Sequence, residues 1–167
     1  MEGSECLPDN VNHRTMPTIT AKDLTKEYPR SPFEELDGLP WLPRLIDKVR
    51  ALQAGTLGDY NPYPCGGDRH FLGVVGVDAD QLKAQIDSGA DDNEIVQWVK
   101  DHATAGFSER FRVYREQALA PVSGEYLGYL EEALGELKTS RPELDTSKVD
   151  NFTSLLCLEE GYPYPGI

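Results

Sequence analysis

The segment WLPRLIDKVRALQAG, residues 41–55, carries the strongest secondary-structure signal in the sequence. Its apolar residues recur at the spacing i, i+3, i+4, i+7 and i+10, which places them on one side of a helix. They are Leu42, Leu45, Ile46, Val49 and Leu52. Pro43 suits the first turn of a helix, and Gly55 suits the position just after its end. We therefore predict a helix over residues 41–54 that buries this apolar side in the core.

The other side of the predicted helix is charged and carries Arg44, Asp47, Lys48 and Arg50. Arg44 and Asp47 are three residues apart, as are Asp47 and Arg50, so ion pairs along the helix surface are geometrically natural. A solvated face with such pairs is the simplest interpretation. The functional alternative is an anion-binding edge, because a guanidinium fits a carboxylate or phosphate and the helix N-terminus adds a positive dipole.

Five further helices are predicted downstream, each from an apolar helical spacing that follows a capping residue. The capping residues are Asp78 with Gln81, Asp91 with Glu94, Ser108, Ser123, and Ser147 with Asp150. Residues 55–67 hold four Gly and two Pro and predict a long loop, and strand-like alternation is confined to residues 73–77. The expected fold is mainly α: a single compact domain of five or six short helices with long irregular connectors.

The N-terminal part of the chain shows no helical periodicity. Residues 1–20 are polar and predict a flexible tail, because they bury too little to offset the entropy of ordering. Residues 21–40 contain Pro29, Pro32 and Pro40, which favour extended, turn-rich chain with little to place in a sheet. The helical domain is therefore expected to span residues 21–167.

The charge balance excludes several classes of partner. The 167 residues include 29 Asp and Glu against 16 Lys and Arg, a net charge of −13. This sign argues against nucleic acid and anionic membranes, and no apolar run approaches the ~20 residues of a membrane-spanning helix. Residues 78–101 and 116–145 each hold seven acids and two bases, whereas residues 22–50 hold six of each. A local cationic pocket for a small anion is compatible with that balance.

The cysteines and histidines give no metal-binding spacing. Cys6, Cys65, Cys157, His13, His70 and His102 form no CxxC pair, no HExxH motif and no His pair one helical turn apart. No dinucleotide or P-loop glycine motif appears either, so neither a metal nor a cofactor is expected. Scattered thiols and the lack of an export signal after Met1 predict a cytoplasmic location.

Several strings of residues resemble one bacterial family. They lie at residues 23–25, 29–32, 42–50, 54–60, 68–69, 71–72, 76–79, 91–99, 155–156 and 158–161. The pattern, most specific over residues 29–60, is similar to the domain-of-unknown-function family 5069 over about residues 21–161. The resemblance implies kinship and a single domain, and it implies no reaction.

Candidate catalytic groups gather in the glycine-rich loop and just after it. Tyr60, Asp68 and His70 can transfer protons or orient a substrate, and Asp47 on the neighbouring helix can join them. Functional groups concentrate in loops beside rigid elements. The simpler interpretation is a well-ordered connector in which Asp68 pairs with Arg69 or caps a helix.

Candidate substrate-binding residues are Arg30, Arg44 and Arg69, which can hold an anion, and Trp98. Arg30 stands between two prolines, so its guanidinium is preorganised; the simpler interpretation is that it pairs with an acid and pins the segment. Trp98 is more simply a core residue. Cys65 would need a nearby base and a lowered pKa to act as a nucleophile.

Two functions from different classes fit these observations. The first is a cofactor-independent acid/base enzyme, an isomerase, lyase or cyclase acting on a small anionic or carbonyl-containing metabolite. The second is a non-catalytic small-molecule-binding or protein-interaction module. A pocket into which the candidate groups converge would favour the enzyme, and groups that pair with one another would favour the module. A C2 homodimer is expected on frequency alone.

Overall fold

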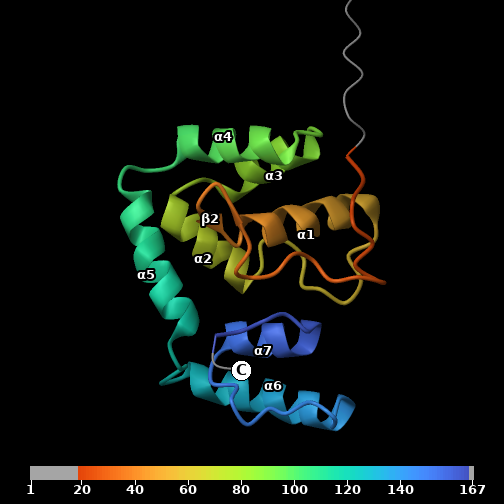
Figure 1. Cartoon of the computed structure of the whole chain (residues 1–167). Coiled ribbons are helices and arrows are strands. Elements are labelled where there is room, and N and C mark those ends of the chain that lie inside the picture. The colour runs from red at the N-terminus through yellow and green to blue at the C-terminus, as the bar shows by residue number, and fades with distance from the viewer. Residues whose placement is uncertain (1–18, 166–167) are drawn as a thin grey trace, which may run out of the picture.

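Helix α1 (Leu42–Ala54) forms where the apolar spacing predicts it, and nine of its 13 residues are buried. The computed structural model describes residues 19–165, so the predicted tail, residues 1–20, falls almost entirely outside it (Figure 1). The described residues form β1 (Glu35–Leu36), β2 (Leu39–Pro40), α1, α2 (Gly66–Val75), α3 (Ala79–Asp87), α4 (Asp92–His102), α5 (Phe107–Leu119), α6 (Tyr126–Ser140) and α7 (Phe152–Glu160). The predicted mainly α fold is confirmed, with seven helices in residues 19–165 where five or six were expected.

The additional helix is α2, over residues for which the sequence predicts none. The glycines at positions 66, 67 and 73 remove the helix signal from this stretch of sequence, because each lowers helix propensity by about 1 kcal/mol. Packing of Phe71 and Val75 in the core offsets this cost. The first turn is fixed by a capping box in which the Cys65 N–H donates to the Asp68 carboxylate at 2.9 Å. The strand-like alternation over residues 73–77 is therefore the end of a helix.

Helix starts agree with the sequence where the cap is local and strong. The Asp78 side chain accepts from the Gln81 N–H at 3.0 Å, and Asp91 and Glu94 form the predicted capping box. The other three predicted starts are shifted. Helix α5 begins after Gly106 rather than at Ser108, α6 begins at Tyr126, and α7 is capped by Asn151.

A short hairpin, β1–β2, lies in the stretch where the sequence offers little to place in a sheet. Its strands are antiparallel, with Glu35 opposite Pro40. Asp37 and Gly38 form the turn with φ of 48° and 79°. Positive φ at both central residues is the requirement of the tightest hairpin turn, for which Asp-Gly is a preferred sequence. That dipeptide is the signal that the proline-based prediction overlooks.

The helices build two hydrophobic cores of unequal size. The first joins the hairpin to α1–α5, around residues such as Leu45, Phe71 and Phe111. The second joins α6 to α7, around Leu130 and Leu137. In Figure 1, α5 runs down one side of the molecule from α4 to the α6–α7 pair, and α7 lies between α6 and α1.

The lengths of the helices decide whether any of them could cross a membrane. The longest helix in the described range is α6, with 15 residues. Within residues 19–165, no helix combines the length and the apolar character needed to cross a bilayer.

Candidate functional site

The charged face of α1 is buried, which corrects the expectation of a solvated face. Arg44, Asp47 and Lys48 are 2%, 5% and 3% exposed. Each pairs with a residue from another segment instead of a neighbour along the helix. Charged side chains are almost never fully buried unless they are paired. The segments that supply the partners therefore also cover this face.

Arg30 holds the proline-flanked segment against α1 and α4. Its backbone N–H donates to Asp47 Oδ2 at 2.8 Å, and its guanidinium donates to the same carboxylate at 2.8 to 3.1 Å. The guanidinium also donates to Asp92 at 2.6 Å, and Arg50 donates to the other oxygen of Asp92 at 2.7 Å. This is the pinning role that the simpler interpretation predicts for Arg30.

The guanidinium groups of Arg30 and Arg50 keep the Asp92 carboxylate ionised. Burial raises the pKa of Asp92, but hydrogen bonds and charge from Arg30 and Arg50 outweigh burial and bring that pKa below its ordinary value of 3.8. Burial lowers the pKa of Arg30, but its hydrogen bonds to Asp47 and Asp92 outweigh burial and raise it. Arg30 and Asp92 are therefore both charged at neutral pH, where they form an ion pair.

Arg44 joins α1 to the end of α7. Its two terminal nitrogens donate to the two oxygens of Glu160, both at 2.7 Å. The guanidinium lies 5.6 and 5.7 Å from the ring centroids of Trp41 and Tyr60. The Tyr60 hydroxyl donates to Glu160 at 3.0 Å. Burial and the charge of Glu160 raise the pKa of Tyr60, so its hydroxyl stays protonated at neutral pH.

Asp68 is wholly buried and collects three donors. The indole N–H of Trp41 donates to its Oδ1 at 3.0 Å, and Lys48 Nζ and the Cys65 N–H donate to its Oδ2 at 3.1 and 2.9 Å. Lys48 Nζ also lies 3.0 Å from Cys65 Sγ. Asp68 therefore caps a helix, and its charged partner is Lys48 where the sequence suggested Arg69.

The contacts around Arg30, Arg44 and Asp68 form one buried network, because Arg44 donates to the Arg30 carbonyl at 3.3 Å and lies against Trp41. Three predicted site residues lie apart from it. Arg69 is exposed on α2. His70 stacks on Tyr114 with ring centroids 4.9 Å apart, and desolvation lowers the pKa of His70. Trp98 stacks on His102 at 4.2 Å on α4. The five that belong to the network are Arg30, Arg44, Asp47, Tyr60 and Asp68.

Five members of the network are not among the predicted site residues: Trp41, Lys48, Arg50, Asp92 and Glu160. Asp92 lies 62 residues from Arg30 and 42 from Arg50, and Glu160 lies 116 residues from Arg44, so no local spacing connects them. Lys48 and Arg50 are different, because the sequence already places them on the charged side of α1 with Arg44, although not as site residues.

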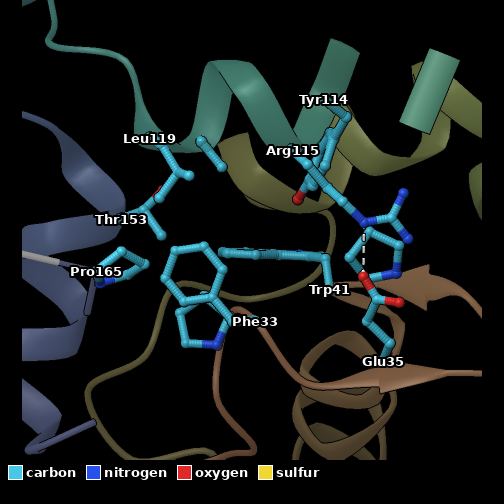
Figure 2. A pocket seen from close by; sticks show the side chains of 11 residues that line it. Phe33, Glu35, Trp41, Tyr114, Arg115, Leu119, Thr153 and Pro165 are labelled. Atoms are coloured by element: carbon cyan, nitrogen blue, oxygen red, sulfur yellow. Dashed lines mark hydrogen bonds and ion pairs between the residues drawn. The ribbon is translucent and has the colours of Figure 1, made fainter. Parts of the chain in front are cut away.

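An apolar pocket of about 170 Å³ lies beside the network, at the junction of the two cores. It is lined by Pro32, Phe33, Glu35, Pro40, Trp41, Tyr114, Arg115, Ala118, Leu119, Thr153 and Pro165. Figure 2 shows the indole of Trp41 between an end formed by Leu119, Thr153 and Pro165 and an end where Arg115 pairs with Glu35. None of the eight residues predicted for the site lines this pocket.

Trp41 is fixed in the pocket by its backbone, by a hydrogen bond and by a glycine. Its φ of 68° is uncommon for a residue with a Cβ, and such strain is often found at functional sites. Its indole N–H is bound to Asp68. A Cβ at Gly67 would lie 2.2 Å from the indole ring, so glycine is required there. Trp41 thereby connects the pocket wall to the buried network.

Metal ligation finds no support in the described part of the chain. Residues 19–165 contain no group of three or more His, Cys, Asp or Glu side chains suited to a metal ion. The thiols of Cys65 and Cys157 are free, and burial raises the pKa of Cys157 to about 11. Cys6 and His13 lie outside the described residues.

Fold and site together define a small helical domain with a buried ion-pair network and an apolar pocket beside it. The chain belongs to the family DUF5069, a domain of unknown function, whose model matches residues 26–161. Comparison with curated proteins finds no match.

Proposed function

We propose that the protein is a non-catalytic binding module whose apolar pocket receives one side chain of a partner protein. The observation that carries this proposal is the pocket beside Trp41, which is apolar and bounded at one end by an ion pair. Ligand sites are commonly preformed concavities of this kind, mainly apolar with a few placed polar groups.

The volume of the pocket limits its ligand. Sites for drug-sized molecules measure about 300–1,000 Å³, whereas a cavity of about 150 Å³ accommodates benzene. At about 170 Å³, the pocket fits one aromatic ring or one branched aliphatic side chain. A Phe, Leu or Ile anchor on a partner protein matches this volume.

The state of the charged groups also favours a module over an enzyme. Arg30, Arg44 and Asp47 are paired within the fold, and both oxygens of the wholly buried Asp68 accept hydrogen bonds. A general acid or base must come within hydrogen-bond reach of the proton it transfers. Groups that pair with one another support the second of the two functions weighed from the sequence.

Fluorescence of Trp41 tests the proposal. The chain has two tryptophans, so Trp98→Phe leaves Trp41 as the single reporter. We expect N-acetyl-phenylalaninamide and N-acetyl-leucinamide to change its emission in a saturable manner and to raise Tm, because they bind the native state. The matching glycinamide should do neither.

Two variants locate the response. Ala118→Phe fills the pocket from α5 and should abolish the change in emission. Gln117→Phe adds the same ring at an exposed neighbouring position outside the pocket lining and should leave it intact. A response that survives Ala118→Phe, or none with either apolar probe, would contradict the proposal.

The cofactor-independent acid/base enzyme is a second candidate on one observation. Desolvation lowers the pKa of His70, so its imidazole is neutral and able to accept a proton, and its stacking partner Tyr114 lines the pocket. A thermal-shift screen of small carboxylates, phosphates and ketones tests it. Turnover of a stabilising compound that is lost in His70→Asn would favour the enzyme, and a flat screen would favour the module.

We also propose a cytoplasmic location and a homodimer. Free thiols such as Cys65 and Cys157 persist in reducing compartments, and C2 dimers are the commonest assemblies. Fractionation of cells and sedimentation of the purified chain measure these two properties.

A further inference from the structure

The wall of the pocket beside Trp41 contains a buried hydroxyl group that the fold leaves without a partner. Tyr114 lines the pocket from α5 and is 7% exposed, and its hydroxyl makes no hydrogen bond within residues 19–165. Figure 2 shows this hydroxyl turned toward the Trp41 indole. Burial raises the pKa of Tyr114, so the hydroxyl keeps its proton. Because most buried hydroxyls are bonded, this one is a donor available to a ligand.

The next residue, Arg115, adds donors at one end of the same pocket. Its Nε donates to Glu35 at 2.7 Å, and its Nη2 donates to the Gly38 carbonyl at 3.1 Å. A guanidinium has five N–H groups, and those on Nη1 have no acceptor within residues 19–165. The Arg115 side chain is 43% exposed, so a ligand can reach it.

The acids of the β1–β2 hairpin, which lie at this end of the pocket, are both paired with a base. Glu35 pairs with Arg115, and Asp37 pairs with Lys100. A second acceptor at Arg115 therefore meets neutralised carboxylates and unused donors. A guanidinium with a neighbouring hydroxyl suits a carboxylate, whose two oxygens can each accept a hydrogen bond. The ligand group expected at this end is therefore a carboxylate.

The opposite end of the pocket is apolar and open to solvent. Leu119 lines it and is 43% exposed, and Phe152, next to the lining residue Thr153, is 38% exposed. Figure 2 places Leu119 and Arg115 at opposite ends, with the Trp41 indole between them. A peptide chain that leaves the pocket at the Leu119 end has apolar side chains to rest on. That favours the end of a protein chain over a small free acid.

We propose that the anchor received by the pocket is the C-terminal residue of the partner protein. Its apolar side chain fills the space beside Trp41, and its carboxylate accepts hydrogen bonds from Arg115 and the Tyr114 hydroxyl. The residues that precede it pass over Leu119. This inference rests on the proposed function, since it uses the same pocket, and it adds the carboxylate. Capture of a C-terminal carboxylate is a recurrent mode of peptide recognition.

Peptides that differ only at their C-terminus test the proposal with the full chain carrying Trp98→Phe. The probes are the acetylated pentapeptide Ser-Leu-Ser-Leu-Phe as the free acid and as the amide, with N-acetyl-phenylalanine as the small acid. By titration of Trp41 emission, we expect the peptide acid to bind about tenfold more tightly than the peptide amide. The small acid should bind more weakly than the peptide acid, because it lacks the preceding residues.

Matched variants show which side chains recognise the carboxylate. Arg115→Gln should bring the affinities for acid and amide close together, whereas Arg112→Gln removes the same charge from α5 outside the pocket and should keep them apart. Glu35→Gln should widen the difference, because it frees Nε and removes a repelling charge, and the exposed Glu34→Gln should not.

Tyr114→Phe separates ligand recognition from a structural role of the hydroxyl. It should weaken binding of the peptide acid severalfold without lowering Tm, because the hydroxyl has no partner within the described fold. A hydroxyl that only supports the structure would give the reverse, a lower Tm and an unchanged ratio of acid to amide affinity.

Each failure has a distinct meaning. Equal affinities for peptide acid and peptide amide would overturn this inference, while saturable binding of the amide would leave the proposed function standing. No response to either peptide would contradict both. An equal effect of Arg112→Gln and Arg115→Gln would mean that the acid responds to net charge alone. Equal affinity for N-acetyl-phenylalanine and the peptide acid would assign the pocket to a small free carboxylic acid.

Discussion

Glu160 receives two hydrogen bonds from a single guanidinium, so its charge cannot be removed without leaving Arg44 buried and unpaired. Burial alone would lower the pKa of Arg44, but the hydrogen bond and charge of Glu160 outweigh burial and raise it, so Arg44 remains charged. Breaking a buried pair in this way typically destabilises a protein by about 3–5 kcal/mol, even where the intact pair adds little.

Glu160→Gln is therefore expected to lower the free energy of unfolding by about 3 kcal/mol. For a chain of this size that corresponds to a fall in Tm of roughly 10 °C. Urea unfolding and calorimetry measure both quantities. Glu159→Gln is the matched control, because burial raises the pKa of Glu159 and removing its charge should cost little. Similar losses of unfolding free energy in the two variants would show that the ion pair between Arg44 and Glu160 does not stabilise the fold.

Asp92 predicts a pH-dependent contribution to stability. A carboxyl whose pKa is depressed in the folded state stabilises the fold above its ordinary pKa, and this stabilisation is lost as pH falls toward the folded pKa. The free-energy difference between the native chain and Asp92→Asn should therefore be constant near neutral pH and shrink below pH 3.8. Urea unfolding of the native chain and of Asp92→Asn across pH measures this difference. A difference that persists at the lowest pH would contradict the assignment.

At the scale of whole elements, α2 and its contact with Trp41 give a sharp comparison. A Cβ at Gly67 would lie 2.2 Å from the indole, whereas a Cβ at Gly66 would meet nothing within 4 Å. Gly67→Ala should destabilise the protein by about 1–3 kcal/mol and shift Trp41 emission. Gly66→Ala should stabilise it by up to about 1 kcal/mol through helix propensity. Unfolding of both variants in a Trp98→Phe background tests this, and equal effects would refute it.

The same elements show how far the sequence predicts this fold and where it fails. The apolar face of α1 and the capping box of Asp91 with Glu94 depend on residues a few positions apart, so a local pattern predicts them. The charged face of α1 has the polarity of a solvated surface, and its burial depends on partners such as Glu160, 116 residues away from Arg44. Helix α2 is hidden because its core contacts offset a propensity that its glycines lower.

The candidate site follows the same division. Arg30 could be predicted to pin its segment because Pro29 and Pro32 lie within two residues of it, and the structure gives it Asp47 and Asp92 as partners. The pocket could not be predicted, since its lining combines residues from the N-terminal segment, α5 and the region around α7. A pocket at the junction of two cores exists only once tertiary packing is complete.

At the scale of the whole molecule, polar contacts carry much of the junction between the two cores. The Tyr162 hydroxyl donates to the Pro29 carbonyl at 2.6 Å, and Arg44 binds Glu160. Leu156 of α7 packs against the first core, and the rings of Phe33 and Tyr164 lie 5.7 Å apart. The second core itself has four buried residues against 18 in the first, so α6 and α7 have less apolar burial to hold them.

This imbalance predicts that α6 and α7 open before the rest of the molecule. Segments with few buried apolar contacts exchange their amide hydrogens through local openings of low free energy. In native-state hydrogen exchange, amides of α6 should therefore report a lower opening free energy than amides of α1. Glu160→Gln should increase the difference in opening free energy between α1 and α6, because undocking α7 lets the unpaired Arg44 reach water. Glu159→Gln should leave that difference unchanged. If all helices exchanged through one global opening in every variant, the two cores would be a single cooperative unit.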